Sequence, residues 1–144
     1  MMVIGSGPLE DQVRHACEKY SNLHYIGYIP RSTCLQYLAG SDLLVLPSRI
    51  EGTPTVLLEA MALKVPIVAS KIPGILNVVD DTSAILIDST QPVELANTIN
   101  KYVSNYPKEL VIKAYEKVSS EFNWDTVISS YVELYTLLLG KLWN

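Results

Sequence analysis

Two glutamates, Glu51 and Glu59, stand eight residues apart, the first in a loop of turn-forming residues and the second in an apolar run from Val56 to Leu63. Glu59 is the only charged residue in that run. A lone charge on an apolar helix costs free energy unless a partner satisfies it. The pattern therefore indicates a ligand contact at Glu59. The alternative is that Glu51 is solvated and Glu59 caps a nearby backbone group.

The residues between the glutamates are suited to bind an anion. Thr53 is expected to be the N-cap of a helix and Pro54 its first residue, because proline lacks the N–H that has no partner there. The N–H groups of Thr55 and Val56 would then face out of the helix N-terminus, where the helix dipole favours a diphosphate. The helix follows a predicted strand over residues 42–46, a continuous apolar run that suits burial on both faces. The N-terminus of the helix therefore lies at the edge of the sheet where open α/β folds bind ligands.

The two carboxylates suit neutral hydroxyl groups beyond that diphosphate. Glu51, followed by Gly52 in the loop, can reach past the phosphates to sugar hydroxyls. Glu59, more than a turn into the helix, can accept a bidentate pair of hydroxyls such as ribose presents. Backbone amides for phosphate and carboxylates for hydroxyls together predict a nucleotide diphosphate sugar as the ligand, bound as a substrate without a cofactor.

Strands and helices that must position these groups alternate along the chain. The predicted strands are residues 2–4, 23–26, 42–46, 65–69 and 84–87, and the predicted helices are residues 9–20, 31–39, 54–63, 92–104, 107–120 and 124–139, with a short helix or turn at 75–79. Alternation at this spacing predicts an α/β fold, a doubly wound parallel sheet with flanking helices. The aromatic and leucine residues of 124–139 recur at helical spacing, which predicts packing.

Composition excludes several classes of protein. The chain of 144 residues fits one domain, with 49% hydrophobic and 18% charged residues. Its net charge of −4 argues against nucleic acid as a partner. No apolar stretch is long enough to span a membrane, and the N-terminus lacks the features of a secretory signal, so we expect a cytoplasmic protein. Cys17 and Cys34 are isolated and are expected to be buried free thiols; no metal-ligand spacing occurs.

Several motifs in this order closely resemble the donor-binding domain of the group 1 family of retaining glycosyltransferases, which have two Rossmann-like domains (the GT-B type). The motifs are Val3–Leu9, His24–Tyr28, Pro47-Ser48, Glu51-Gly52-x-Pro54, Leu57–Ala62, Val65–Ser70 and Phe122-Asn-Trp124. The resemblance implies that Glu51 contacts the donor sugar and takes part in catalysis, and that Glu59 contacts the nucleotide ribose. It also implies that backbone amides from Thr53 to Val56 approach the sugar and the phosphates.

The same resemblance implies roles for residues nearer the N-terminus. Gly5 and Gly7 would lie close to the donor, in the turn after a strand. A dinucleotide-binding fingerprint would need a third glycine where Glu10 stands, so NAD binding is disfavoured. The loop with Gly27 and Tyr28 is similar to the one that lines the base pocket, although a packed aromatic is an equally simple interpretation of Tyr28.

The sequence departs from the family pattern at two loops and at its start. Lys64 stands where the family usually has glycine after a helix, which implies a strained or a different cap, at a cost of about 1 kcal/mol. Pro73-Gly74 replaces a usual Gly-Gly. The family's first central strand, its phosphate-binding Gly-Arg and Lys-Gly, and its N-terminal acceptor domain have no counterpart here. We therefore expect a Rossmann-like fold truncated at the N-terminus, from a fragment, a split gene or an engineered piece, with the acceptor domain or a partner subunit supplying the rest.

The activity that the resemblance implies is transfer of a hexosyl group from a nucleotide diphosphate sugar to a hydroxyl acceptor, with retention. Surface glycan biosynthesis, in the cytoplasm or at the inner face of the membrane, is the expected setting, and no metal is implied. Residues 1–144 would be the donor-binding part only, and inactive alone. Two alternatives stay open: a non-catalytic nucleotide-sugar-binding remnant or subunit, and a sugar-nucleotide epimerase-like domain.

Overall fold

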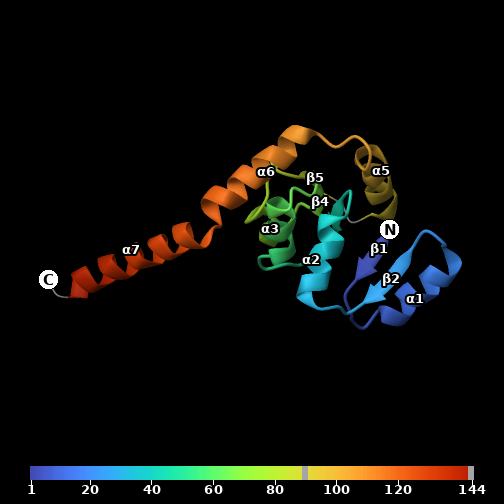
Figure 1. Cartoon of the computed structure of the whole chain (residues 1–144), viewed down its shortest axis with the longest axis horizontal. Coiled ribbons are helices and arrows are strands. Elements are labelled where there is room, and N and C mark those ends of the chain that lie inside the picture. Colours follow the sequence, from blue (N-terminus) through green and yellow to red (C-terminus); the bar gives the residue numbers. More distant parts are fainter. Residues whose placement is uncertain (89–90, 143–144) are drawn as a thin grey trace. The chain divides into compact units, whose positions relative to one another are not determined.

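Helices and parallel strands alternate through a computed structural model of the chain, which describes residues 1–88 and 91–142 (Figure 1). The chain divides into two compact units, Met1–Gly40 and Ser41–Asn144. Each unit has a parallel sheet of its own. The expected α/β class with parallel strands and flanking helices is confirmed.

The first unit is one strand–helix–strand repeat followed by a helix. Strand β1 (Met2–Ile4) pairs in parallel with β2 (His24–Gly27), and helix α1 (Glu10–Lys19) connects them. Helix α2 (Arg31–Ala39) follows. Acidic residues in the first turn of α1 and a lysine in its last turn complement the helix dipole.

The second unit contains a three-stranded parallel sheet in the order β3-β4-β5. Its elements are β3 (Leu44–Leu46), α3 (Thr55–Ala62), β4 (Ile67–Ser70), α4 (Pro73–Leu76), β5 (Ile85–Ile87), α5 (Pro92–Tyr102), α6 (Lys108–Glu121) and α7 (Trp124–Leu142). All four residues of β4 are buried, as expected for a central strand covered on both faces.

The core of this unit forms where α3 meets β4 and α6. Leu57, Ala60 and Met61 lie three and four residues apart on α3 and are fully buried. Ala114 of α6 is also buried, and α6 contacts α3. Each large apolar side chain buried here contributes about 1.5–3 kcal/mol to folding. The core therefore fixes α3, the helix that carries Glu59.

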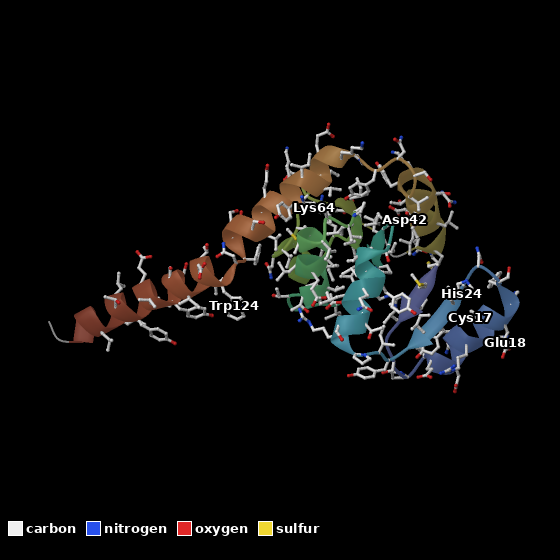
Figure 2. The ribbon with its side chains drawn as sticks, viewed as in Figure 1. Cys17, Glu18, His24, Asp42, Lys64 and Trp124 are labelled. Atoms are coloured by element: carbon white, nitrogen blue, oxygen red, sulfur yellow. The ribbon has the colours of Figure 1, made fainter. Side chains whose placement is uncertain are left out.

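The end of α3 has the strained cap that the sequence predicts. Lys64 has a φ of 58°, in the left-handed region where glycine is preferred. The Lys64 N–H donates to the Met61 carbonyl (3.2 Å) and the Val65 N–H donates to the Ala60 carbonyl (2.9 Å), which is the Schellman pattern. Lys64 is labelled in Figure 2. Its Nζ lies 4.3 Å from the ring centre of Tyr115, on α6. This cation–π contact opposes the backbone strain.

Helix α7 carries its apolar side chains in solvent. Trp124, at its first residue (Figure 2), is 78% exposed, and eight further large apolar residues of the helix are also exposed. At 100° per residue most of them fall on one continuous face. The helical spacing is confirmed, but among the apolar residues expected to pack in 124–139 only Val127 is half-buried, and the others are exposed. The eight further exposed residues are Ile128, Tyr131, Val132, Leu134, Tyr135, Leu137, Leu138 and Leu139.

Two expectations about burial are wrong. The thiols of Cys17 and Cys34 are half-buried and free rather than buried. Strand β3 is half-buried as well, although its apolar run predicted burial on both faces. Among the described strands, β3 pairs with β4 alone, so it is an edge of its sheet. An unpaired edge leaves side chains that a neighbouring strand would otherwise cover.

Candidate functional site

The candidate anion site is the N-terminus of α3. The helix begins at Thr55 with Pro54 as its N-cap, one residue later than expected, so Thr53 lies before the cap. The fixed φ of proline suits both the N-cap and the first helical position, so the sequence did not distinguish them. The Leu57 N–H donates to the Pro54 carbonyl (3.1 Å). The amides of Thr55 and Val56, ahead of it, are the first-turn N–H groups that normally lack an acceptor within the helix.

Glu51 is held by a residue that sequence reasoning left without a role. The Ser48 Oγ donates a hydrogen bond of 2.6 Å to Glu51 Oε1, and both residues are half-buried. Ser48 lies two residues after the end of β3, so the strand positions the Ser48 hydroxyl, and the hydroxyl sets the direction of the Glu51 carboxylate. Hydrogen bonds to a charged group are stronger than neutral ones. The only signal in the sequence is the Pro47-Ser48 motif that precedes Glu51.

Glu59 lies on the same side of α3 as the side chains of Thr55 and Val56. It lies four residues after Thr55 and three after Val56, the spacings that place side chains on the same side of a helix. Leu57 points the other way, into the core. Glu59 is half-buried, less enclosed than its apolar sequence context implied. Glu59 therefore lies one turn after the candidate anion site, at a position of α3 that the core covers only in part.

A close approach of two backbones supports the loop over residues 47–54, between β3 and α3, which we call the Glu51 loop. A Cβ atom added to Gly74, in α4, would lie 2.1 Å from the Glu51 carbonyl oxygen and 2.6 Å from that of Gly52. Real Cβ atoms are essentially never found so near. Gly52 and Thr53 are exposed, whereas Pro54 is buried. The loop therefore rests on α4 on one side and presents Gly52 and Thr53 to solvent.

In the first unit, the turn after β1 is joined to the end of β2. The Gly5 N–H donates to the Gly27 carbonyl (2.9 Å), and the Tyr25 hydroxyl donates to the Gly5 carbonyl (2.8 Å). Gly5 has a φ of 130° and Gly27 a φ of 76°, both in the range that L-residues with a side chain rarely adopt. These two glycines are therefore required by the backbone geometry of the turn.

The remaining predicted residues of this unit lie in solvent. Tyr28 is 81% exposed, so it is not a packed aromatic. Gly7 is exposed, and its carbonyl accepts a hydrogen bond from the Glu10 N–H (3.1 Å) at the start of α1. The Glu10 carboxylate pairs with Arg14 at 2.6 Å, which lowers the pKa of Glu10. Gly5, Gly7 and Tyr28 belong to the first unit, and the residues from Glu51 to Glu59 to the second.

A strong electrostatic contact lies in the turn over residues 80–83. The Lys117 Nζ donates to Asp80 Oδ2 at 2.7 Å, and Thr82 donates to Oδ1 through its N–H and its hydroxyl. These hydrogen bonds, with Lys117 the largest cause, hold the pKa of Asp80 well below its usual range. The pair ties the turn to α6 and is a structural contact.

The described part of the chain holds neither a cluster of metal ligands nor a membrane-spanning helix. Within residues 1–88 and 91–142, no group of three or more His, Cys, Asp or Glu residues is placed to hold a metal ion. None of the described helices is both long and apolar enough to cross a membrane.

The family of the chain follows from its sequence as a whole. Residues 1–119 match the family model described as glycosyl transferases group 1, so the chain belongs to this family of sugar transferases. The expected membership is confirmed.

Relatives include glycosyltransferases named for the biosynthesis of teichuronic acid and of colanic acid. A Bacillus subtilis glycosyltransferase named for teichuronic acid biosynthesis is 33% identical over 99 residues, which are 67% of this chain and 25% of that protein. An Escherichia coli glycosyltransferase named for colanic acid biosynthesis is 30% identical over 138 residues, 87% of this chain and 34% of that protein. The chain thus spans about a quarter to a third of the length of these relatives.

Solved structures share the fold. HepE of Anabaena in complex with UDP superimposes with a TM-score of 0.78 at 23% identity, over 94% of this chain and 40% of HepE. HepE with UDP-glucose gives 0.79 at 22% identity. TarM of S. aureus, in a complex that includes UDP, gives 0.79 at 25% identity, over 93% of this chain and 28% of TarM. The Rossmann-like GT-B fold expected from the sequence is confirmed.

Proposed function

We propose that the chain is the nucleotide-sugar-binding part of a retaining hexosyltransferase that builds surface glycans, and that its ligand is a nucleotide diphosphate sugar. One observation carries the proposal: a glutamate stands on each side of the first-turn amides of α3 along the chain. Glu51 precedes them, held by Ser48 at 2.6 Å, and Glu59 lies one turn inside the helix. HepE and TarM, which share the fold, were solved with UDP or UDP-glucose.

In this proposal each group has a separate role. The amides of Thr55 and Val56 bind the diphosphate, because the positive end of the helix dipole favours anions there. Glu59 accepts the two ribose hydroxyls. Glu51 accepts sugar hydroxyls and orients the sugar for departure of the diphosphate, a reaction that depends on positioning and on stabilising the leaving group.

The complete donor domain needs more than this chain presents. Strand β1 pairs only with β2 and strand β3 only with β4 among the described strands. Free edges of parallel strands carry backbone groups that require partners. We propose that a further strand covers such an edge, and that an acceptor-binding domain or partner subunit completes the enzyme. A cytoplasmic location at the inner face of the membrane stays a prediction.

Calorimetric titration of the chain with UDP-glucose and with GDP-mannose tests the ligand. We expect one of them to bind, and we expect Glu59→Ala to weaken it by about tenfold to a hundredfold, as for loss of hydrogen bonds to a charged group. Glu116→Ala is the matched control, because Glu116 is an exposed helical glutamate on α6.

The other outcomes discriminate between functions. Absence of binding at millimolar concentrations of both sugars would refute donor binding and support a remnant without a ligand. Turnover of the donor by this chain with an acceptor would refute the need for a further domain. Interconversion of donor sugars without an acceptor would identify an epimerase.

A further inference from the structure

We propose that Gly74 is a positioning residue for the reaction, because its lack of a side chain sets where the backbone of Glu51 and Gly52 lies. This inference rests on the proposed function of the Glu51 loop. It assigns the loop after β4 a role in recognition of the sugar part of the donor, separate from the recognition of its nucleotide part.

The geometry leaves no room for any other residue at this position. The nearest atoms to a Cβ at Gly74 are all backbone atoms of the Glu51 loop, at 2.1 Å, 2.5 Å and 2.6 Å. A flexible side chain can turn aside from such a contact, whereas backbone atoms move only if the loop or α4 shifts. The contact is therefore a direct spacing constraint between two segments that are 22 residues apart in sequence.

Helix α4 is fixed firmly enough to act as a support. Gly74 and Ile75 are buried, and the Ile72 carbonyl accepts hydrogen bonds of 3.0 Å from the N–H groups of both Ile75 and Leu76. Pro73 restricts the backbone at the first residue of the helix. The preceding strand, β4, is the buried centre of the sheet. An added methyl group at Gly74 is consequently expected to displace the exposed loop rather than the core.

The loop has two other attachments, and they act on different atoms. Ser48 holds the carboxylate of Glu51, and buried Pro54 holds the start of α3. Gly74 acts on the backbone of Glu51 and Gly52. A side chain at Gly74 therefore moves the carboxylate that faces the sugar, while Pro54 keeps the amides of α3 in place. Displacements of about 1 Å can reduce a reaction rate by a hundredfold.

The test compares binding of UDP-glucose with binding of UDP by the whole chain and by Gly74→Ala. We expect the variant to lose about tenfold in affinity for UDP-glucose and to bind UDP within about twofold of the parent chain. Gly140→Ala is the matched control, since a Cβ added to Gly140, in α7, meets nothing within 4 Å. A merely structural role of Gly74 would change both ligands alike.

The results separate this inference from the function on which it rests. Failure of the parent chain to bind either ligand refutes the donor site itself. Binding of both ligands by Gly74→Ala at parental affinities refutes the positioning role and leaves the donor site standing. If Gly74→Ala does not fold, Pro73→Gly provides the second variant, because it keeps Gly74 and loosens its backbone. Selective loss of UDP-glucose affinity in Pro73→Gly supports the role, and unchanged affinity refutes it.

Discussion

Replacing Lys64 by alanine and by glycine separates two opposing contributions to stability at the end of α3. The left-handed backbone at Lys64 is strained for any residue with a Cβ atom. The contact of its Nζ with the Tyr115 ring, at 4.3 Å, is favourable. Lys64→Ala keeps the strain and removes the contact, whereas Lys64→Gly removes both.

The magnitudes predict an order of stability. Relief of the left-handed strain by glycine is worth about 1 kcal/mol relative to alanine. The cation–π contact is worth about 0.5–1 kcal/mol, because both Lys64 and Tyr115 are exposed to solvent. We therefore expect Lys64→Ala to be about 0.5–1 kcal/mol less stable than the parent chain. Lys64→Gly should lie within about 0.5 kcal/mol of the parent, since the gain and the loss nearly cancel.

Urea denaturation of the three proteins measures these differences, and a second set carrying Tyr115→Leu isolates the contact. With the ring removed, Lys64→Ala should no longer lower the free energy of unfolding, and Lys64→Gly should raise it by about 1 kcal/mol. An equal loss for Lys64→Ala with and without the ring would show that the contact does not stabilise the fold. A glycine variant less stable than the alanine variant would refute the strain argument.

Three further substitutions test contacts of the second unit, each by urea denaturation. The lowered pKa of Asp80 means that the pairing of Asp80 with Lys117 stabilises the fold at pH values above 3.8, the ordinary pKa of the carboxyl, and that this stabilisation is lost as the pH falls below 3.8. Asp80→Asn should therefore flatten the loss of stability between about pH 5 and pH 2. An unchanged slope would contradict this. The Ser70 Oγ is buried with no hydrogen-bond partner among the described residues. Ser70→Ala should then keep or raise the free energy of unfolding, by up to about 1 kcal/mol, and a fall of that size would reveal a partner. Tyr106→Phe removes the hydroxyl that donates to the Ile67 carbonyl at 2.9 Å and should lower stability by about 1 kcal/mol; no change would mean that water replaces this bond.

The sequence predicts features that depend on neighbours along the chain. The periodicity locates the strands and helices to within a few residues, and α2 begins and ends where expected, at Arg31 and Ala39. The strain at Lys64 also follows from local order, since a Schellman cap needs a left-handed residue after the helix. These features are set by hydrogen bonds between residues a few positions apart.

Features that need tertiary contacts could not be predicted from the sequence. The contact of Gly74 joins α4 to the Glu51 loop, and no pattern of neighbouring residues in the sequence predicts this contact. The half-burial of β3 depends on which strands pair with it. The Ser48–Glu51 hydrogen bond requires a particular loop conformation after β3. The roles of Glu51 and Glu59 remain predictions.

The exposed apolar side chains of α7 have a consequence for the dynamics of the chain. Most of the stability of a protein helix comes from packing of one face, and helices without it are marginal in water. At the other extreme, β4 is buried at every residue. We expect backbone amides of α7 to exchange with deuterium by local unwinding on a far shorter timescale than those of β4, which open only in global unfolding. Equal protection of the two elements would show that the face of α7 is covered in solution.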